Sequence, residues 1–403
     1  MGTTRYLRAG CVEPLNWIAK NEDTKMRTLA GWACGVVLGG AALGLTGCSG
    51  FFVDVKNGTG SGSGSADYVY VVNQTSNTLG EFAVGSGALT AISGSPITLT
   101  TNLNASSVAV TRPNTYAYVG GQGQISCYSV GAGGALTGIS ANSISATANF
   151  VSLETSVDGQ WLLALDGTTL TVYVYAINAT SGLLTTHGAV PFTASGTSGK
   201  VTQRAIKQSP NGTLVGVALG PGGDVIFQFN TTTGTLTQSA ALGIASGFSD
   251  NALLFDSVSA NIFIARGGPT TGTGNIALYS VTATGQPVFV SSTVSGNSPY
   301  ALQMDMTSTY LYAANRADNT VSGYTYSGTT LVPIANSPFS TGLSPAALAR
   351  DNSGKYVLAV NSGGSSDVIL FGFDVVTPGK LNGLASSASG TDPAGAVAIA
   401  ATH

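Results

Sequence analysis

The stretch that decides the fold is YLYAAN at residues 310–315, because the same pattern returns along the chain. Two close copies are YVYVVN (68–73) and YVLAVN (356–361). Seven copies end at residues 73, 120, 166, 219, 266, 315 and 361, with spacings of 46 to 53 residues and a mean of 48. A regular period of 40–50 residues indicates a repeat architecture, in which each repeat is one supersecondary unit.

Each copy has the same surroundings. A small-residue strand and a turn precede it, as in SPAALARDNSGK (344–355). An alternating strand follows it, as in DVILFGFDV (367–375), and then a glycine turn and a strand that opens with G-x-L-T, as in residues 134–137. Because no helix-period segment of useful length follows residue 50, the sequence predicts an all-β fold. Four short strands per repeat predict a seven-bladed β-propeller of four-stranded blades.

The two ends of the repeat region predict how the ring closes. The first repeat begins directly with 68–73 and lacks the small-residue strand, whereas the chain ends with DPAGAVAIAATH (392–403), which matches that strand and has nothing after it. We therefore expect the C-terminal strand to complete blade 1, with residues 395–401 as its inner strand. Closure leaves only short, protected sheet edges.

These residues resemble a known family. SPAAL (344–348), DNSGKYVLAVN (351–361) and FGFDVVTPGKL (371–381) are similar to the YVTN-repeat propellers and to the larger seven-bladed lactonase family that includes 6-phosphogluconolactonase-like proteins. The resemblance covers residues 67–403. It implies hydrolysis of a lactone or other carboxylic ester, with His, Glu and Arg on one face of the ring. In the metal-dependent propeller lactonases it also implies a Ca²⁺ ion held by Glu, Asn and Asp.

The acid and base inventory of this chain departs from that expectation. Hydrolysis of a cyclic ester needs a base for the attacking water and donors for the oxyanion. The chain has two histidines, His187 on an expected outer strand and His403 at the end, and its repeat region has two glutamates, Glu81 and Glu154. None of the four is expected in a loop where several blades meet. The catalytic residues therefore stay unassigned, and a binding protein is favoured over a hydrolase.

The candidate ligand face lies where the loops between the second and third strands and the loops between blades come together. Arg266 and Arg316 stand out there because cations are rare in this chain, and they could hold an anionic or sugar-like group. The alternative for Arg316 is a surface ion pair with Asp318. Asn73, Asn315 and Asn361 occupy equivalent positions and either satisfy their own turns or offer oxygens to Ca²⁺. The candidate residues on this face are Asp166, Arg204, Asp250, Arg266, Asn315, Arg316, Asp318 and Asn361, and Asp224, Asn251 and Asp367 lie in the same loops.

The N-terminal region reads as a targeting segment. Lys25 and Arg27 precede the uncharged run 29–45, which ends in the lipobox-like LTGC of residues 45–48. This order is typical of a secretory signal, and we expect cleavage before Cys48 and lipidation of its thiol. A plain signal peptide or an N-terminal membrane helix is the alternative. We predict these boundaries: a mis-assigned extension over 1–25, a lipoprotein signal over 26–47, a Gly/Ser tether over 48–66 and the propeller over 67–403.

Composition limits the partners. From Cys48 onward the chain has 10 basic and 15 acidic residues, so no basic patch for nucleic acid is expected. Cys127 is the one cysteine left after processing, and its strand-like surroundings favour a core residue over a nucleophile.

The sequence thus predicts an extracytoplasmic platform, anchored in the bacterial envelope, that binds a glycan or a protein. A lactonase-like hydrolase is the first alternative and a structural role in the envelope the second. No metal site is assigned, no cofactor is required, Ca²⁺ stays open, and the oligomeric state is not predicted.

Overall fold

The computed structural model describes residues 67–195, 201–270, 272, 274–282 and 284–403. They belong to one compact unit, Ser63–His403. The expected translation start at Met26, the lipidated Cys48 and the tether all lie outside the described residues. Within the described ranges, no helix has the length and apolar character needed to cross a membrane.

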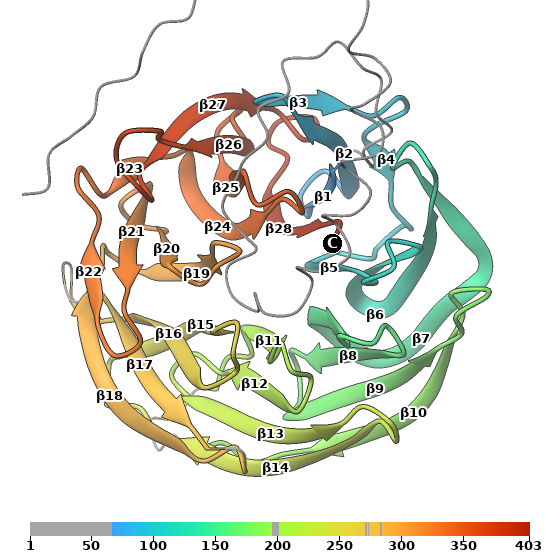
Figure 1. Ribbon diagram of the computed structural model, residues 1–403. Coiled ribbons are helices and arrows are strands. Elements are labelled where there is room, and N and C mark those ends of the chain that lie inside the picture. The colour runs from blue at the N-terminus through green and yellow to red at the C-terminus, as the bar shows by residue number, and fades with distance from the viewer. Residues whose placement is uncertain (1–66, 196–200, 271, 273, 283) are drawn as a thin grey trace, which may run out of the picture. The chain divides into compact units, whose positions relative to one another are not determined.

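The described strands form seven blades around a centre (Figure 1). Blade 1 pairs β28, β1, β2 and β3, and the blades that follow blade 3 are β11–β14, β15–β18, β19–β22 and β24–β27, each in sequence order from the centre outward. The strand bounds in these five blades are β1 Asp67–Asn73, β2 Thr78–Gly85, β3 Ala88–Ala91, β11 Ala205–Gln208, β12 Leu214–Ala218, β13 Asp224–Asn230, β14 Thr235–Leu242, β15 Ser249–Phe255, β16 Asn261–Gly267, β17 Asn275–Val281, β18 Pro287–Val294, β19 Pro299–Met304, β20 Tyr310–Asn315, β21 Thr320–Tyr326, β22 Leu331–Pro333, β24 Leu343–Arg350, β25 Tyr356–Gly363, β26 Val368–Phe373, β27 Leu381–Ser387 and β28 Ala396–Ala401. The short strands β4 (Ile97–Thr98) and β23 (Phe339–Ser340) add a second piece to the outer edge of blades 1 and 6.

Blades 2 and 3 depart from the expected four short strands. They share one sheet of β5 (Ser107–Val110), β6 (Tyr116–Val130), β7 (Leu136–Thr155), β8 (Trp161–Asp166), β9 (Thr171–Ile177) and β10 (Leu184–Pro191). The first part of β7 pairs with β6 as the outer strand of blade 2, and its last residues pair with β8 as the inner strand of blade 3. The reason lies in the sequence, because 139–150 contains neither Gly nor Pro to end the strand.

The first and last strands of the ring belong to one blade. β28 pairs antiparallel with β1, with Ala400 opposite Tyr70 and Ile399 opposite Val71. Thr402 extends the pairing, because its N–H donates to the carbonyl of Tyr68 at 2.9 Å. The C-terminal strand therefore occupies the inner position of blade 1, where the sequence places it.

The core lies between neighbouring blades, because the second strand of each blade is buried on both faces. Every residue of β8 is buried, and Val69 to Val72 of β1 are 0% exposed. One apolar cluster joins Val69 and Phe82 of blade 1 to Leu358 and Leu370 of blade 7. Removal of such apolar surface from water is the main force that holds one blade on the next.

A tyrosine contact also fastens three of the described blades to the next one along the ring. The hydroxyl of Tyr70 donates to the carbonyl of Gly134 at 2.7 Å, and Tyr118 and Tyr312 make the same bond to Gly182 and Gly379. These glycines have φ angles of 78°, 69° and 77°, in the left-handed region that other residues avoid. The glycine of the G-x-L-T motif thus allows a tight turn and a close approach of the aromatic ring from the preceding blade.

Candidate functional site

A repeated β-bulge shapes one end of the central channel. Among the described inner strands, five skip one residue in the pairing with the second strand, and the skipped residues are Val151, Asn251, Tyr300, Ala346 and Val397. Val151, Asn251, Tyr300 and Ala346 each lie five residues before the start of the turn that joins the first two strands, and Val397 has the equivalent place in the C-terminal strand β28. Bulges commonly redirect side chains next to binding sites. Here they bring one residue from each blade to the same end of the ring.

A cavity of about 450 Å³ opens at this end, and we call it the bulge-side cavity. All five bulged residues line it, together with Ser106 and Arg204 at the equivalent positions of blades 2 and 4. Its size suits a monosaccharide-sized ligand. Side chains able to bond hydroxyl groups also line it: Gln74, Gln203 and Asn251.

Two arginines gather on one tyrosine in this cavity. The Cζ atom of Arg316 lies 4.5 Å from the ring centre of Tyr300, and that of Arg204 lies 5.5 Å from it. Arg204 Nη1 also donates to the Tyr300 hydroxyl at 3.1 Å, whereas its Nε is buried without a hydrogen-bond partner. Neither arginine pairs with a carboxylate in the part of the chain that the structure describes. The expected Arg316–Asp318 surface pair is therefore wrong.

Arg266 does not join this pair. Its Nε and Nη2 donate to the two carboxylate oxygens of Asp250 at 2.7 and 2.8 Å, and Asp250 is 0% exposed. Asp224 lies beside them, fully buried, and its carboxyl oxygens have no hydrogen-bond partner among the described residues. Burial, and then repulsion by Asp250, raise the pKa of Asp224 well above its usual range. These three residues form a buried charged group at the junction of blades 4 and 5.

The polar residues at the blade ends fasten loops instead of facing the cavity. Asn315 donates to Thr320 and Ser322 of its own blade, and its oxygen accepts a bond from Ser295 of the preceding blade at 2.9 Å. Asn361 is fixed in the same way by Ser366 and Thr341. The prediction that such residues satisfy their own turns is confirmed, and the bond to the preceding blade adds to it.

The two acidic candidates other than Asp250 also accept hydrogen bonds from nearby loops. Asp166 is 1% exposed and accepts bonds from the backbone of Asn149 and from Thr168 and Thr169. These hydrogen bonds lower the pKa of Asp166 although burial opposes them. Asp318 is exposed and accepts the Asn297 backbone N–H at 2.6 Å. Of the eight predicted face residues, the structure thus brings Arg204 and Arg316 together at the cavity.

Sequence reasoning missed Tyr300, the residue that holds both arginines. It lies in SPYALQM (298–304), which resembles an ordinary inner strand. The signal was available in the repeat register, because Tyr300, Arg204 and Asn251 occupy the same position in successive blades. That position carries small or apolar residues in blades 1, 2, 3 and 7, so its polar members mark one side of the cavity.

A second cavity, of about 330 Å³, lies at the other end of the inner strands, and we call it the turn-side cavity. Glu154, Lys207 and His403 line it. The expectation that Glu154 and His403 lie away from the convergence of blades is therefore wrong, because the inner strands carry both to the channel wall. His187 does lie on an outer strand, β10, packed on Trp161 with ring centres 4.8 Å apart.

Neither a metal centre nor a reactive thiol is evident. Among the described residues, no group of three or more His, Cys, Asp or Glu side chains is placed to hold a metal ion. The side-chain oxygens of Asn73, Asn315 and Asn361 each accept a hydrogen bond from a hydroxyl. A calcium ion stays an untested prediction.

Cys127 is buried as expected, and burial raises the pKa of its thiol to about 12, which disfavours the nucleophilic thiolate.

Comparisons with known proteins agree with this architecture. Residues 55–198 match the model of the family described as "Lactonase, 7-bladed beta-propeller". A comparison with curated proteins finds no match. A putative 6-phosphogluconolactonase from Bacteroides fragilis superposes with a TM-score of 0.71 at 16% identity, over 85% of this chain and 100% of that chain. The corresponding protein from Bacteroides uniformis gives 0.71 at 15% identity, over 84% and 100%.

A third similar structure is the periplasmic gluconolactonase of Pseudomonas aeruginosa, with a TM-score of 0.68 at 15% identity over 84% of this chain and 99% of that chain. At such identities the likeness establishes the fold and leaves the chemistry to the residues of this chain. The chain is thus a lactonase-like seven-bladed β-propeller that shares the fold of the 6-phosphogluconolactonase-like proteins.

Proposed function

We propose that the chain binds an acidic sugar in the bulge-side cavity without hydrolysing it. The observation that carries this proposal is the pair Arg204 and Arg316, held on Tyr300 at the cavity wall with no described carboxylate to neutralise them. A guanidinium donates two parallel hydrogen bonds to a carboxylate, which gives both affinity and orientation. The Tyr300 ring restrains both side chains, so less rotamer entropy is lost on binding.

The rest of the cavity supports binding over hydrolysis. Its described lining contains no carboxyl or imidazole group that could take a proton from water. Lys207 is the remaining cation of the lining, and its ammonium group lies 3.0 Å from Glu154. Gln74, Gln203 and Asn251 offer donors and acceptors suited to sugar hydroxyls.

The test is calorimetric titration of the full-length protein with gluconate and glucuronate, with glucose as the neutral control. We expect saturable binding of the two acids, and about tenfold weaker binding in Arg316→Ala and in Arg204→Ala, since a hydrogen bond to a charged group contributes about 1.5 kcal/mol or more. Lys355→Ala, which removes an exposed cation outside both cavities, serves as the matched control. Equal affinity for glucose and gluconate would contradict the role of the arginines.

Lactone hydrolysis is the second candidate, favoured by the match of residues 55–198 to the lactonase family. A panel of γ-, δ- and sugar lactones, with and without Ca²⁺, distinguishes the two. We expect rates no faster than in buffer. Turnover above the spontaneous rate that disappears in Arg316→Ala would establish an enzyme at this cavity and end the binding-only proposal.

The propeller is also proposed to be exported and held in the bacterial cell envelope by acyl chains on Cys48. The support is the order of basic residues, apolar run and LTGC in residues 25–48. Metabolic labelling with palmitate should mark the wild-type chain and leave Cys48→Ala unlabelled. Equal labelling of both would place the lipid elsewhere, and absence of label from both would exclude it.

A further inference from the structure

The turn-side cavity has a composition unlike that of the bulge-side cavity. The two share an apolar collar of Val108, Leu153, Leu348 and Ile399, with Lys207 beside it. Beyond the collar the turn-side wall carries Arg112, Arg350 and His403. These residues come from three separate chain segments, which the ring closure brings to one opening.

The two arginines of this wall have no ion-pair partner among the described residues. In the described parts of the chain, neither Arg112 nor Arg350 forms an ion pair or a side-chain hydrogen bond, and Arg350 Nε is buried without a partner. Burial lowers the pKa of Arg350, and the neighbouring Arg112 lowers it further, against the attraction of Asp305 and Asp351. Two guanidinium groups that repel each other in one cavity are stabilised by an anion placed between them.

The acidic groups nearby are already engaged. Glu154 accepts from the Lys207 ammonium group at 3.0 Å and from the Gln208 backbone at 3.3 Å. Asp351 binds the Ser353 hydroxyl and the Tyr356 backbone of its own turn, and Asp305 binds Thr309 and Tyr310 in the same way. The main-chain carbonyl of the C-terminal residue accepts from the Asn114 amide at 2.8 Å. None of these described carboxyl groups forms an ion pair with Arg112 or Arg350, so both guanidinium groups stay available to an anionic ligand.

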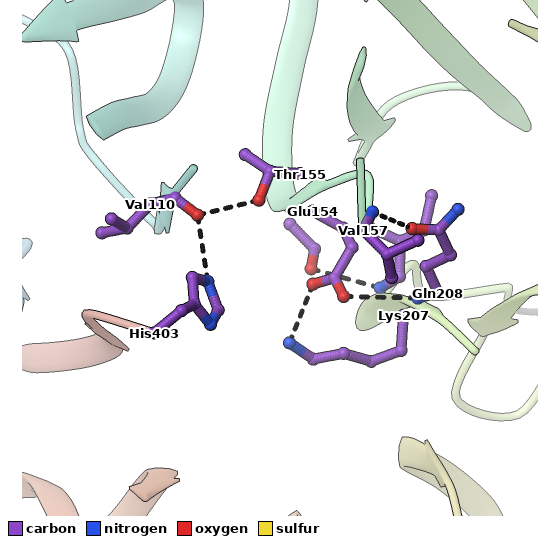
Figure 2. Close-up of polar contacts among 9 residues, drawn as sticks. Val110, Glu154, Thr155, Val157, Lys207, Gln208 and His403 are labelled. Carbon is purple, nitrogen blue, oxygen red and sulfur yellow. Dashed lines mark hydrogen bonds and ion pairs between the residues drawn. The ribbon is translucent and has the colours of Figure 1, made fainter. Parts of the chain in front are cut away.

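His403 lies on the same wall as the two arginines. Its Nε2 lies 3.2 Å from the carbonyl oxygen of Val110, and its ring stands across the opening from the Lys207–Glu154 pair (Figure 2). Asn114 fixes its backbone on both sides, donating to its carbonyl and accepting its N–H at 2.8 Å each. The terminal imidazole is thus held in place at the cavity.

We propose that the turn-side cavity is a second ligand site, which takes a compact oxyanion of the phosphate or sulfate type between Arg112 and Arg350, next to His403. Such an anion offers enough oxygens for two guanidinium forks, whereas a single carboxylate offers two. The cavity volume of about 330 Å³ also leaves room for an organic group attached to the anion. The site lies in a different cavity from the proposed sugar site, so the two proposals stand or fall separately.

The two histidines of the chain allow a direct test by NMR. His403 faces Arg112, Lys207, Glu154, Arg350 and Asp351, and burial together with the Arg112 charge lowers its pKa. A bound oxyanion should therefore raise that pKa and shift the His403 ring signals saturably. His187 on the outer strand β10 is the internal reference and should not respond. The titration uses inorganic phosphate, sulfate and a sugar phosphate against sodium chloride of equal ionic strength.

Variants distinguish binding of an anion at this cavity from general screening of charges by salt. Arg112→Ala changes an exposed side chain and should weaken phosphate binding about tenfold, as should Arg350→Ala, while Lys355→Ala leaves it unchanged. Tighter binding of the sugar phosphate than of phosphate would identify an organic ester as the ligand. Tighter binding of phosphate would identify a free ion. A His403 signal that moves equally with chloride, or only where His187 also moves, would overturn the proposal.

Discussion

At the scale of single residues, the sequence identified the important arginines more easily than the side chains that they contact. Arginines are so few that Arg204, Arg266 and Arg316 could be singled out from the sequence, but whether each meets a carboxylate or a ring depends on packing. Arg266 finds Asp250, and Arg316 finds Tyr300, within their own blades. Arg204 reaches Tyr300 from another blade. A repeat alignment gives the register of such residues, and only packing gives the direction of a long flexible side chain.

Asp224 leads to a prediction about pH. Its carboxyl group has a raised pKa in the folded state, so the folded protein binds that proton more tightly than the unfolded chain does. The stabilisation of the fold by protonated Asp224 is fully present below the pKa of about 3.9 that an aspartate has in the unfolded chain. It is lost as pH rises through the higher pKa of Asp224 in the folded protein. Asp224→Asn stays neutral at every pH, and we expect it to gain about 1 kcal/mol or more in unfolding free energy at pH 8 and little at pH 4.

Denaturant unfolding at both pH values measures this difference. Asp250→Asn is the contrasting variant, because it removes the carboxylate that pairs with Arg266. It should lose about 3 kcal/mol at pH 4, and less at pH 8, where Asp224 can ionise beside Arg266. An Asp224→Asn effect of equal size at pH 4 and pH 8 would show that this carboxyl group does not titrate as described.

At the scale of strands and turns, the seven second strands were predicted from the sequence because their residues are buried on both faces and recur with the repeat. YLYAAN matches β20 residue for residue, and YVLAVN begins where β25 begins. The merged strands β6 and β7 were not predicted, since the absence of a strand-ending residue over 139–150 is a weaker signal than the presence of one. The bulges were also missed, because inner strands such as LSPAALAR consist mostly of small and apolar residues, and these hide the one-residue shift in alternation that a bulge causes.

The aromatic contact between blades predicts unequal effects of one substitution. An added Cβ at Gly134 would meet the Tyr68 ring at 2.2 Å, whereas at the equivalent Gly328 nothing lies within 4 Å. Both have positive φ, 78° and 87°, so Ala strains the backbone at either place. We expect Gly134→Ala to lose about 1–3 kcal/mol more in unfolding free energy than Gly328→Ala.

The two variants are matched in chemistry and in backbone region, so the difference between them isolates the contact with the preceding blade. Blade 5, which precedes Gly328, begins its second strand with Asn261, whose amide is turned to Asp256 at 2.7 Å. Equal losses in the two variants would mean that the ring contact contributes nothing.

At the scale of the whole molecule, stability depends on the pairing of the first strand with the last. Deletion of residues 392–403 removes β28, bares the edge of β1 and opens the cluster that joins blade 1 to blade 7. We expect the melting temperature to fall by on the order of 10 °C or more. A synthetic peptide of residues 392–403 should restore part of the loss when added to the truncated protein. A truncated protein that melts like the full chain would contradict this role of β28.

Pairing between Val69 and Ala401 also sets an order of events during synthesis. A ribosome releases the chain from its N-terminus, so β1 emerges first and waits for its inner neighbour until the last codons have been translated. Six blades can form while blade 1 is still incomplete, and the ring locks only after the chain is finished. The contact that closes the ring is therefore the last one that synthesis makes available.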